Sequence, residues 1–372
     1  MKLKMKAMKF LFSLIVFVAS ITNTHALESS KATKQINRAY KVTKNVNLEI
    51  SNKYGQVIIN TWKKDSVLIK IDVTGFGKDR DASKKLLERA EFEFSQIGDY
   101  VIAETILDRS QGFIKDLWNS IGDYSKSLLG KNKLSIDYEI YMPTSGSINI
   151  IQKFGDLYID DLHGKVTINL SNGNLKMDNL TGTLKLDLEF GRANINHMKS
   201  GIINLRSAEF EVDESNNIEL TSSSSTTVFK TLSNLKIDSR NDRIRIDSLE
   251  TLHGDGSFSN IFIKHIGRTI LADMNYGELW VSKVGRNFKD LQLRGKSTDF
   301  DLMFSKNCKI DVSIVGREDE MTLSYGNYEK TVNEDDDKLI EVKGTLGIGD
   351  VKGGNVDIYA NDGRVKVQYE TQ

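Results

Sequence analysis

The side chains best suited to catalysis are three carboxylates and one arginine. Carboxylate pairs perform the acid–base chemistry of polysaccharide cleavage, and an arginine can neutralise an acidic sugar. These residues are Asp156, Asp160, Asp161 and Arg192. They could converge only if the segments that carry them lie on neighbouring turns of a repeating fold. The set supports one enzyme hypothesis, a polysaccharide lyase or hydrolase.

Other reactive residue types are isolated in the sequence. His163, His197, His253 and His265 form no zinc-binding motif and are expected to be structural. The single cysteine, Cys308, excludes an internal disulfide and a multi-cysteine metal site. We therefore expect no catalytic residues, no metal and no cofactor.

Two further segments could be mistaken for ligand sites. The glycine-rich stretch 344–354 opens no helix, so it predicts strand corners and not a phosphate-binding loop. The acidic run 334–337 lacks the spaced ligands and turn glycine of a calcium loop, and is expected to be solvated.

An internal repeat organises the chain. Gly155, Gly173 and Gly191 recur at a constant step, and each opens a short alternating run. After Gly155 and after Gly173, apolar residues fall at the same six offsets, namely 2, 4, 7, 11, 13 and 15. Such alternation is typical of strands with one buried face. Gly, Asn, Ser and Asp fill the breaks and tolerate the left-handed backbone of a corner.

One such repeat cannot bury its apolar face alone, so successive repeats must stack. The pattern predicts an all-β fold, a single-stranded β-helix (β-solenoid), with the right-handed winding that parallel crossovers prefer. A β-sandwich is the alternative, but the identical offsets favour the solenoid. At 210–240 serines and threonines replace the aromatic-glycine step, and we expect a distorted rung there.

Residues 1–26 are predicted to be a secretory signal peptide. Four lysines precede an apolar run at 10–19, and small residues precede the expected cleavage site after Ala26. A run of this length is too short for a permanent membrane anchor, which needs about 20 residues. Removing the leader leaves 47 basic and 51 acidic side chains, a net charge of −4. Nucleic acid is not expected as a partner of such a chain, because phosphate binding needs a basic face.

The mature chain, 27–372, is predicted to be one β-solenoid domain. Rungs are expected at 27–77 and 133–372, with a partly helical insertion or cap at 78–132. Within the insertion, residues 81–93 have helical spacing, and Asp81 is the expected N-cap.

A second helical pattern covers residues 111–130, with its apolar residues on one face. Two interpretations are open. The segment covers the end of the solenoid, where strand edges would otherwise be exposed, or it projects and binds a partner. The residues that would make the partner contact are Phe113, Leu117, Trp118 and Ile121.

Several motifs resemble a known family. The opening Asn52–Ile59 (NKYGQVII) with Trp62, the segment Lys153–Ile159 (KFGDLYI) and the recurring Phe/Tyr-Gly steps resemble the putative adhesin family (DUF4097-type) of Bacteroidota envelope proteins. The resemblance covers essentially the whole mature chain, but its motifs are structural. It implies a secreted or cell-surface β-helical protein and supplies no catalytic residues.

We therefore expect an exported, non-enzymatic β-helical scaffold at the cell envelope, in the periplasm, on the outer membrane surface or outside the cell. Regular outward rows of polar side chains would suit a repetitive ligand such as a surface glycan. Two alternatives stay open. One is the polysaccharide-degrading enzyme, and the other is an envelope-stress-associated module that binds another protein through residues 111–130.

Overall fold

The computed structural model describes residues 30–107, 133–332 and 338–370. The predicted signal peptide, the segment 111–130 with Phe113, Leu117, Trp118 and Ile121, and the acidic run 334–337 lie outside the described residues. The chain divides into two compact units. The smaller one includes the described residues 30–33, 74–89 and 133–134, and the larger one includes the rest of the described residues.

Strands make up most of the described chain, as the all-β prediction requires. In chain order the elements are β1 (Ser30–Lys41), β2 (Asn47–Lys53), β3 (Val57–Trp62), β4 (Ser66–Gly77), α2 (Arg80–Glu88), β5 (Ala90–Ile97), β6 (Tyr100–Leu107), β7 (Lys133–Pro143), β8 (Ser147–Lys153), β9 (Leu157–Ile159), β10 (Val166–Ser171), β11 (Asn174–Glu189), β12 (Arg192–Arg206), β13 (Glu209–Ser223), β14 (Thr226–Arg240), β15 (Arg243–Ser257), β16 (Asn260–Val284), β17 (Asp290–Phe304), β18 (Cys308–Gly316), a 3-10 turn (Glu318–Glu320), β19 (Met321–Leu323), β20 (Gly326–Val332), β21 (Ile340–Leu346), β22 (Val351–Asn361) and β23 (Val365–Tyr369).

The predicted helix near the N-terminus is α2, in the smaller unit, and it is shorter than expected. Its N-cap is Asp79 and not Asp81, because the Asp79 carboxylate accepts a hydrogen bond from the Ala82 amide at 2.7 Å. The helix ends before Ala90, where an alternating sequence begins the strand β5. That strand pairs antiparallel with β6, so tertiary pairing overrides the helical spacing expected up to residue 93.

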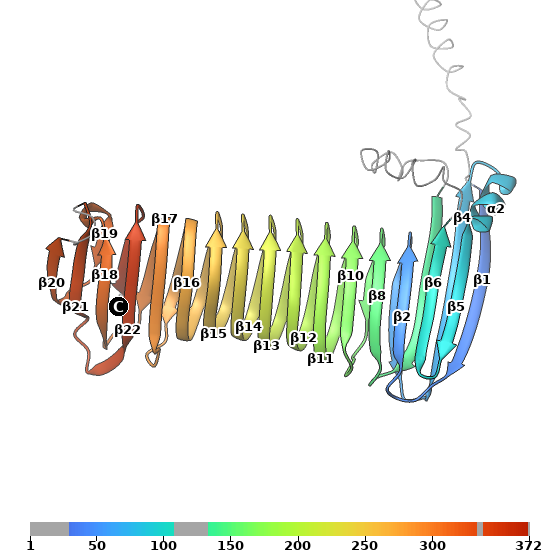
Figure 1. The fold of residues 1–372 in the computed structure, drawn as a ribbon, viewed down its shortest axis with the longest axis horizontal. Helices are drawn as coiled ribbons and strands as arrows, with labels where there is room; N and C mark the ends of the chain where they lie inside the picture. The colour runs from blue at the N-terminus through green and yellow to red at the C-terminus, as the bar shows by residue number, and fades with distance from the viewer. Residues whose placement is uncertain (1–29, 108–132, 333–337, 371–372) are drawn as a thin grey trace, which may run out of the picture. The chain divides into compact units, whose positions relative to one another are not determined.

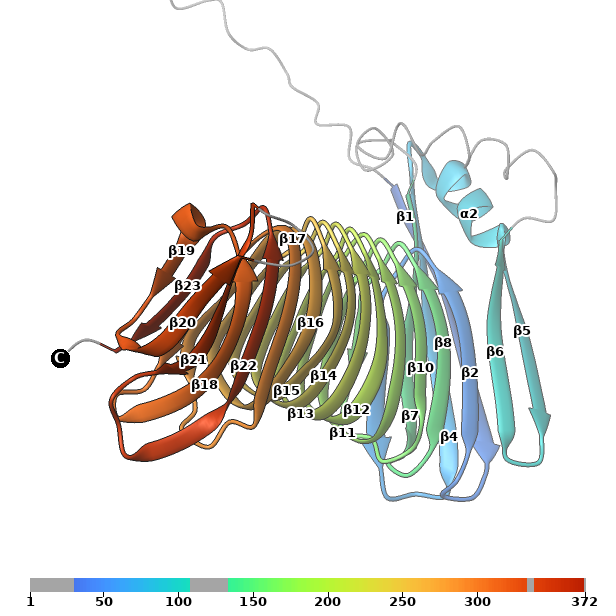
Figure 2. The same ribbon diagram turned by 60° about the vertical axis from the view of Figure 1, so that its left-hand side comes forward.

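The larger unit contains a β-solenoid, which confirms the predicted fold class. A rung such as β12 has two strand segments, 192–198 and 200–206, and both pair in parallel with the equivalent segments of β11 and β13. Figure 1 shows one row of paired strand segments side by side from β8 to β17, and Figure 2 shows the stacked coils. The right-handed winding and the single-domain boundaries stay predictions.

Stacking in register creates the predicted apolar core. Leu157 lies opposite Leu175, and both are buried. The same inward column continues through Ala193 and Phe210. Each rung therefore adds its apolar side chains to one continuous core.

The repeat length changes along the stack. The pairing partners Leu157, Leu175 and Ala193 are separated by equal steps, but the next step, from Ala193 to Phe210, is shorter by one. The change occurs between the two segments of β12, where the register shifts. Gly201 therefore lies opposite Leu184.

The corner glycines act through close approach and not through left-handed backbone. The left-handed residue is the one before the glycine, such as Asn172 (φ 56°) or Phe190 (φ 53°). The glycine that follows has no room for a side chain. A Cβ on Gly173 would collide with the carbonyl oxygen of Gly155, and one on Gly191 with that of Gly173.

Both ends of the solenoid are interleaved, which the sequence order did not predict. The rung made by β2 and β3 lies between β6 and β7 on one side and β8 and β9 on the other. At the other end, β22 and β23 lie between β17 and the pair β18–β19. Residues 326–332 and 340–346, where a rung was expected, instead form the antiparallel pair β20–β21.

The region 210–240 is regular, so the prediction of a distorted rung was wrong. Strands β13 and β14 pair without a register shift. Ser222 and Ser239 occupy the inward column that Leu188 and Leu205 fill in earlier rungs, and both serines are buried.

A buried carboxylate satisfies these inward hydroxyl groups. Asp242, only 5% exposed, accepts hydrogen bonds from the hydroxyls of Ser222 (2.6 Å) and Ser239 (2.7 Å). It also accepts from the backbone amides of Ser225 (2.7 Å) and Arg240 (3.0 Å). This buried polar cluster replaces the apolar packing of the other rungs with a satisfied network, as a buried charge requires.

We predict that Gly173→Ala lowers the free energy of unfolding by about 1–3 kcal/mol, because the added Cβ overpacks against the Gly155 backbone. Denaturant unfolding measures this loss. Gly201→Ala is the control, since the nearest atoms to its Cβ would be the ends of the Ile203 and Met198 side chains, at 3.1 and 3.2 Å. Equal losses in the two variants would contradict the close-approach argument.

We predict that Asp242→Ala lowers the free energy of unfolding by about 2–4 kcal/mol, because each buried donor left unpaired costs about 1–3 kcal/mol. Asp238→Ala, at an exposed position of β14, is the matched control and should change stability by less than about 0.5 kcal/mol. Equal thermal and denaturant midpoints for the two variants would show that the cluster contributes nothing.

Candidate ligand-binding surfaces

Outward side chains form straight rows because equivalent residues of successive rungs lie about 4.8 Å apart. Several rows are linked by hydrogen bonds from rung to rung. The Asn179 side chain donates to Asp161 at 2.6 Å, and the Asn234 side chain donates to Asn217 at 2.9 Å. The outward surface therefore consists of parallel rows of side chains, and each row repeats at the rung spacing.

One row follows the left-handed corners, and we call it the corner strip. Its members in the central rungs are Phe190, Ser207, Ser224, Asn241, Phe258 and Tyr276, all with φ between 49° and 57°. Left-handed backbone is unusual for a bulky residue, whereas asparagine adopts it more readily. The aromatic members therefore adopt a backbone conformation that is unfavourable for their residue types.

The aromatic corner residues are also exposed. Phe190, Phe258 and Tyr276 have exposed fractions of 52%, 58% and 45%. The Phe258 and Tyr276 rings stack with their centroids 5.0 Å apart and their planes at 9°. Stacking between rungs offsets part of the cost of exposing these two rings.

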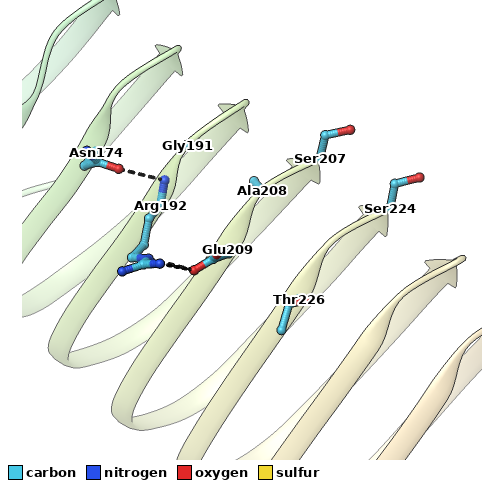
Figure 3. A pocket seen from close by; sticks show the side chains of 8 residues that line it. All are labelled: Asn174, Gly191, Arg192, Ser207, Ala208, Glu209, Ser224 and Thr226. Carbon is cyan, nitrogen blue, oxygen red and sulfur yellow. Dashed lines mark hydrogen bonds and ion pairs between the residues drawn. The ribbon is translucent and has the colours of Figure 1, made fainter.

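A depression of about 460 Å³ lies beside the corner strip, where small residues replace the aromatic ones (Figure 3). Ser207 and Ser224 project from successive rungs beside it. Arg192 and Glu209 line it and form an ion pair, with Arg192 Nε 2.7 Å from Glu209 Oε2. The Arg192 backbone amide donates a hydrogen bond to Asn174 Oδ1 at 3.2 Å.

The buried polar cluster lies directly inside this strip. Ser225 and Asp242 follow the corner residues Ser224 and Asn241 in the chain, and both are buried. The Ser225 hydroxyl accepts a hydrogen bond from the Ala208 amide at 3.2 Å, which ties one corner to the next. The cluster therefore fixes the backbone that presents the small corner residues.

A second hollow, the side groove, has a volume of about 680 Å³ and runs along the start of the second segments across several rungs. One of its rows has a hydroxyl or amide on every rung, and the next row is mostly charged. The hydroxyl and amide row consists of Thr183, Ser200, Asn217, Asn234 and Thr251. The mostly charged row consists of Lys185, Ile202, Glu219, Lys236 and His253. Lys236 and Glu219 form an ion pair at 2.7 Å.

The carboxylates of the enzyme hypothesis do not converge. Asp156 accepts from the Asn174 amide at 2.8 Å, and Asp161 accepts from the Asn179 amide at 3.2 Å. Asp160 accepts from the Thr61 amide at 3.3 Å, and Arg192 binds Glu209. Each group therefore joins its own rung to a neighbour.

The isolated histidines lie on different rungs. His163 Nδ1 lies 2.9 Å from the Thr181 hydroxyl, and His197 Nδ1 lies 2.9 Å from Asn179 Oδ1. His253 lines the side groove, and His265 lies opposite Ser248 in the pairing of β15 with β16. Over residues 30–107, 133–332 and 338–370, no group of three or more His, Cys, Asp or Glu is placed to hold a metal ion.

Cys308 begins β18, and the glycine-rich stretch joins two strands. Cys308 is buried, and burial raises the pKa of its thiol, so less of the reactive thiolate forms. The stretch 344–354 leads from β21 into β22, two strands, as the interpretation as strand corners requires. Within the described part of the chain, no helix has the length and apolar character needed to cross a membrane.

Sequence reasoning missed both hollows. The corner strip had a visible signal, because Phe190, Phe258 and Tyr276 all stand directly before a corner of the repeat. The side groove had a weaker signal, the recurrence of Thr, Ser and Asn at the start of each second segment. Its lining comes from several successive rungs, whose pairing the alternating pattern does not specify.

No protein-family model and no curated protein sequence matches the chain. The chain is distantly similar to several solved structures. A putative cell adhesion protein from Clostridium sporogenes is 9% identical and covers 91% of this chain and 100% of its own, with a TM-score of 0.18. A putative adhesin from Parabacteroides distasonis is 12% identical and covers 74% of this chain and 98% of its own, with a TM-score of 0.32. A putative lipid binding protein from the same organism is 8% identical and covers 91% of this chain and 97% of its own, with a TM-score of 0.30. At these values the similarities carry no argument about what this chain binds.

Proposed function

We propose that the chain is an exported, non-enzymatic β-solenoid scaffold of the cell envelope that binds an extended surface glycan, as an adhesin does. The observation that carries the proposal is the side groove. It presents Thr183, Ser200, Asn217, Asn234 and Thr251 in one row, one polar group per rung. A polymer of hydroxyl-rich units is the natural complement of such a row.

The chemistry of the groove suits binding. Hydroxyl and amide side chains donate and accept hydrogen bonds with the hydroxyl groups of a sugar chain. The exposed Ile202 side chain adds an apolar surface in the neighbouring row. The row repeats on a rigid scaffold, so little conformational entropy is lost when an extended ligand binds.

The geometry gives the enzyme hypothesis no support. Carboxylate-dependent glycosidases place two carboxyl groups across the scissile bond. The side groove is lined by one carboxylate, Glu219, and the corner depression by one, Glu209, and each is held in an ion pair. Binding without turnover is the function that these hollows favour.

The remaining parts of the proposal rest on the sequence. They are the signal peptide, a location in the periplasm, on the outer membrane surface or outside the cell, and the resemblance to the DUF4097-type family. The alternative, a protein-binding module acting through Phe113, Leu117, Trp118 and Ile121, concerns residues that the structure does not describe.

We predict that Asn217→Trp lowers binding to cells or to a glycan array by about tenfold or more, because the indole fills the side groove. Thr221→Trp is the matched control, at an exposed position on the same strand outside the groove, and should bind as the unchanged protein does. Thermal melting of both variants checks that the solenoid is intact. Absence of any glycan or cell binding by the unchanged protein would overturn the proposal.

A further inference from the structure

We propose that the corner strip is a second binding site, separate from the side groove, that takes a neutral saccharide by stacking a sugar ring on Phe190. The inference rests on the proposed function, since it assigns part of a glycan ligand to a different surface. The juxtaposition that carries it is a half-exposed phenylalanine whose neighbour in the chain, Gly191, and whose neighbour on the corner strip, Ser207, both line the corner depression.

Phe190 is unusually exposed for a phenylalanine. It is 52% exposed, and its φ of 53° lies in a region that disfavours bulky side chains. Two other pairs of aromatic corner residues, Tyr54 with Phe154 and Phe258 with Tyr276, stack their rings. The corner neighbours of Phe190 are Asn172 and Ser207, which offer no ring to stack on.

The depression next to Phe190 is polar and carries no net charge. Arg192 and Glu209 neutralise one another, and Asn174, Ser207, Ser224 and Thr226 add amide and hydroxyl groups. A neutral ligand with hydroxyl groups around its edge fits this lining, whereas an anionic or cationic ligand would have to break the ion pair.

The strip also has a second aromatic platform. The Phe258–Tyr276 stack begins four rungs beyond Phe190, at about 19 Å when rungs are about 4.8 Å apart. Ser207, Ser224 and Asn241 occupy the corners between the two platforms. The arrangement alternates flat apolar faces with hydrogen-bonding groups.

A pyranose ring matches this alternation, because one face of the ring presents C–H groups and its rim presents hydroxyl groups. The face can lie on an aromatic ring while the rim reaches the serines and the ion pair. An aromatic side chain of a protein or a lipid tail would use the rings but leave the polar floor unmatched. The chemistry therefore favours a neutral oligosaccharide lying along the strip.

The test is Phe190→Asn, because asparagine already occupies the same corner position at residues 172 and 241. Calorimetric titration uses the purified protein with linear neutral oligosaccharides of glucose, mannose, xylose or N-acetylglucosamine, and with oligogalacturonate as the charged comparison. We expect at least one neutral oligosaccharide to bind and its affinity to fall about tenfold in the variant, as loss of a stacked ring implies. The melting temperature should stay the same or rise, since asparagine tolerates the left-handed backbone.

Asn217→Trp separates this inference from the proposed function. Loss of neutral oligosaccharide binding in Phe190→Asn, with binding retained in Asn217→Trp, supports the corner site. Glycan binding that is lost only in Asn217→Trp supports the side groove and overturns the corner site. Binding of oligogalacturonate alone, a large drop in the melting temperature of Phe190→Asn, or no saccharide binding at all would each overturn it as well.

Discussion

The architecture depends on the parallel hydrogen bonding of each rung to the rungs before and after it. This pairing fixes the rung spacing at about 4.8 Å and allows no lateral freedom at the corners. At Gly173 and Gly191 the backbone approaches the carbonyl of the preceding rung so closely that no side chain fits. Once the register is set in this way, inward residues such as Leu157 and Leu175 form one core, and outward residues form rows.

The surface hollows follow from small changes to this regular stack. A register shift in β12 shortens the repeat by one residue, and the next corners carry Ser207, Ser224 and Asn241 in place of aromatic residues. In the same rungs, serines replace core leucines, and Asp242 satisfies their hydroxyl groups. The core and the surface thus change together, so the hollow beside the corner strip has a rigid polar support.

The interleaved ends have a consequence for folding. The rung made by β22 and β23 contains nearly the last described residues of the chain, yet it lies between strands that precede it in sequence. That end of the solenoid therefore cannot complete its backbone pairing until β22 and β23 have been synthesised. Non-local pairing of this kind slows folding, because loop closure must precede the contacts that stabilise it.

The sequence alone determined the repeat, the all-β solenoid and the inward columns, because alternation and a constant period depend only on local spacing. It also placed the helix near residue 80, although Asp79 and not Asp81 caps it. Only the tertiary structure decided which rungs are neighbours at the ends, where the period changes, and that Ser222 and Asp242 meet in the core. Those features depend on pairing between distant segments and on the bends between strands, and the hollows beside Phe190 and Asn217 arise from the same long-range geometry.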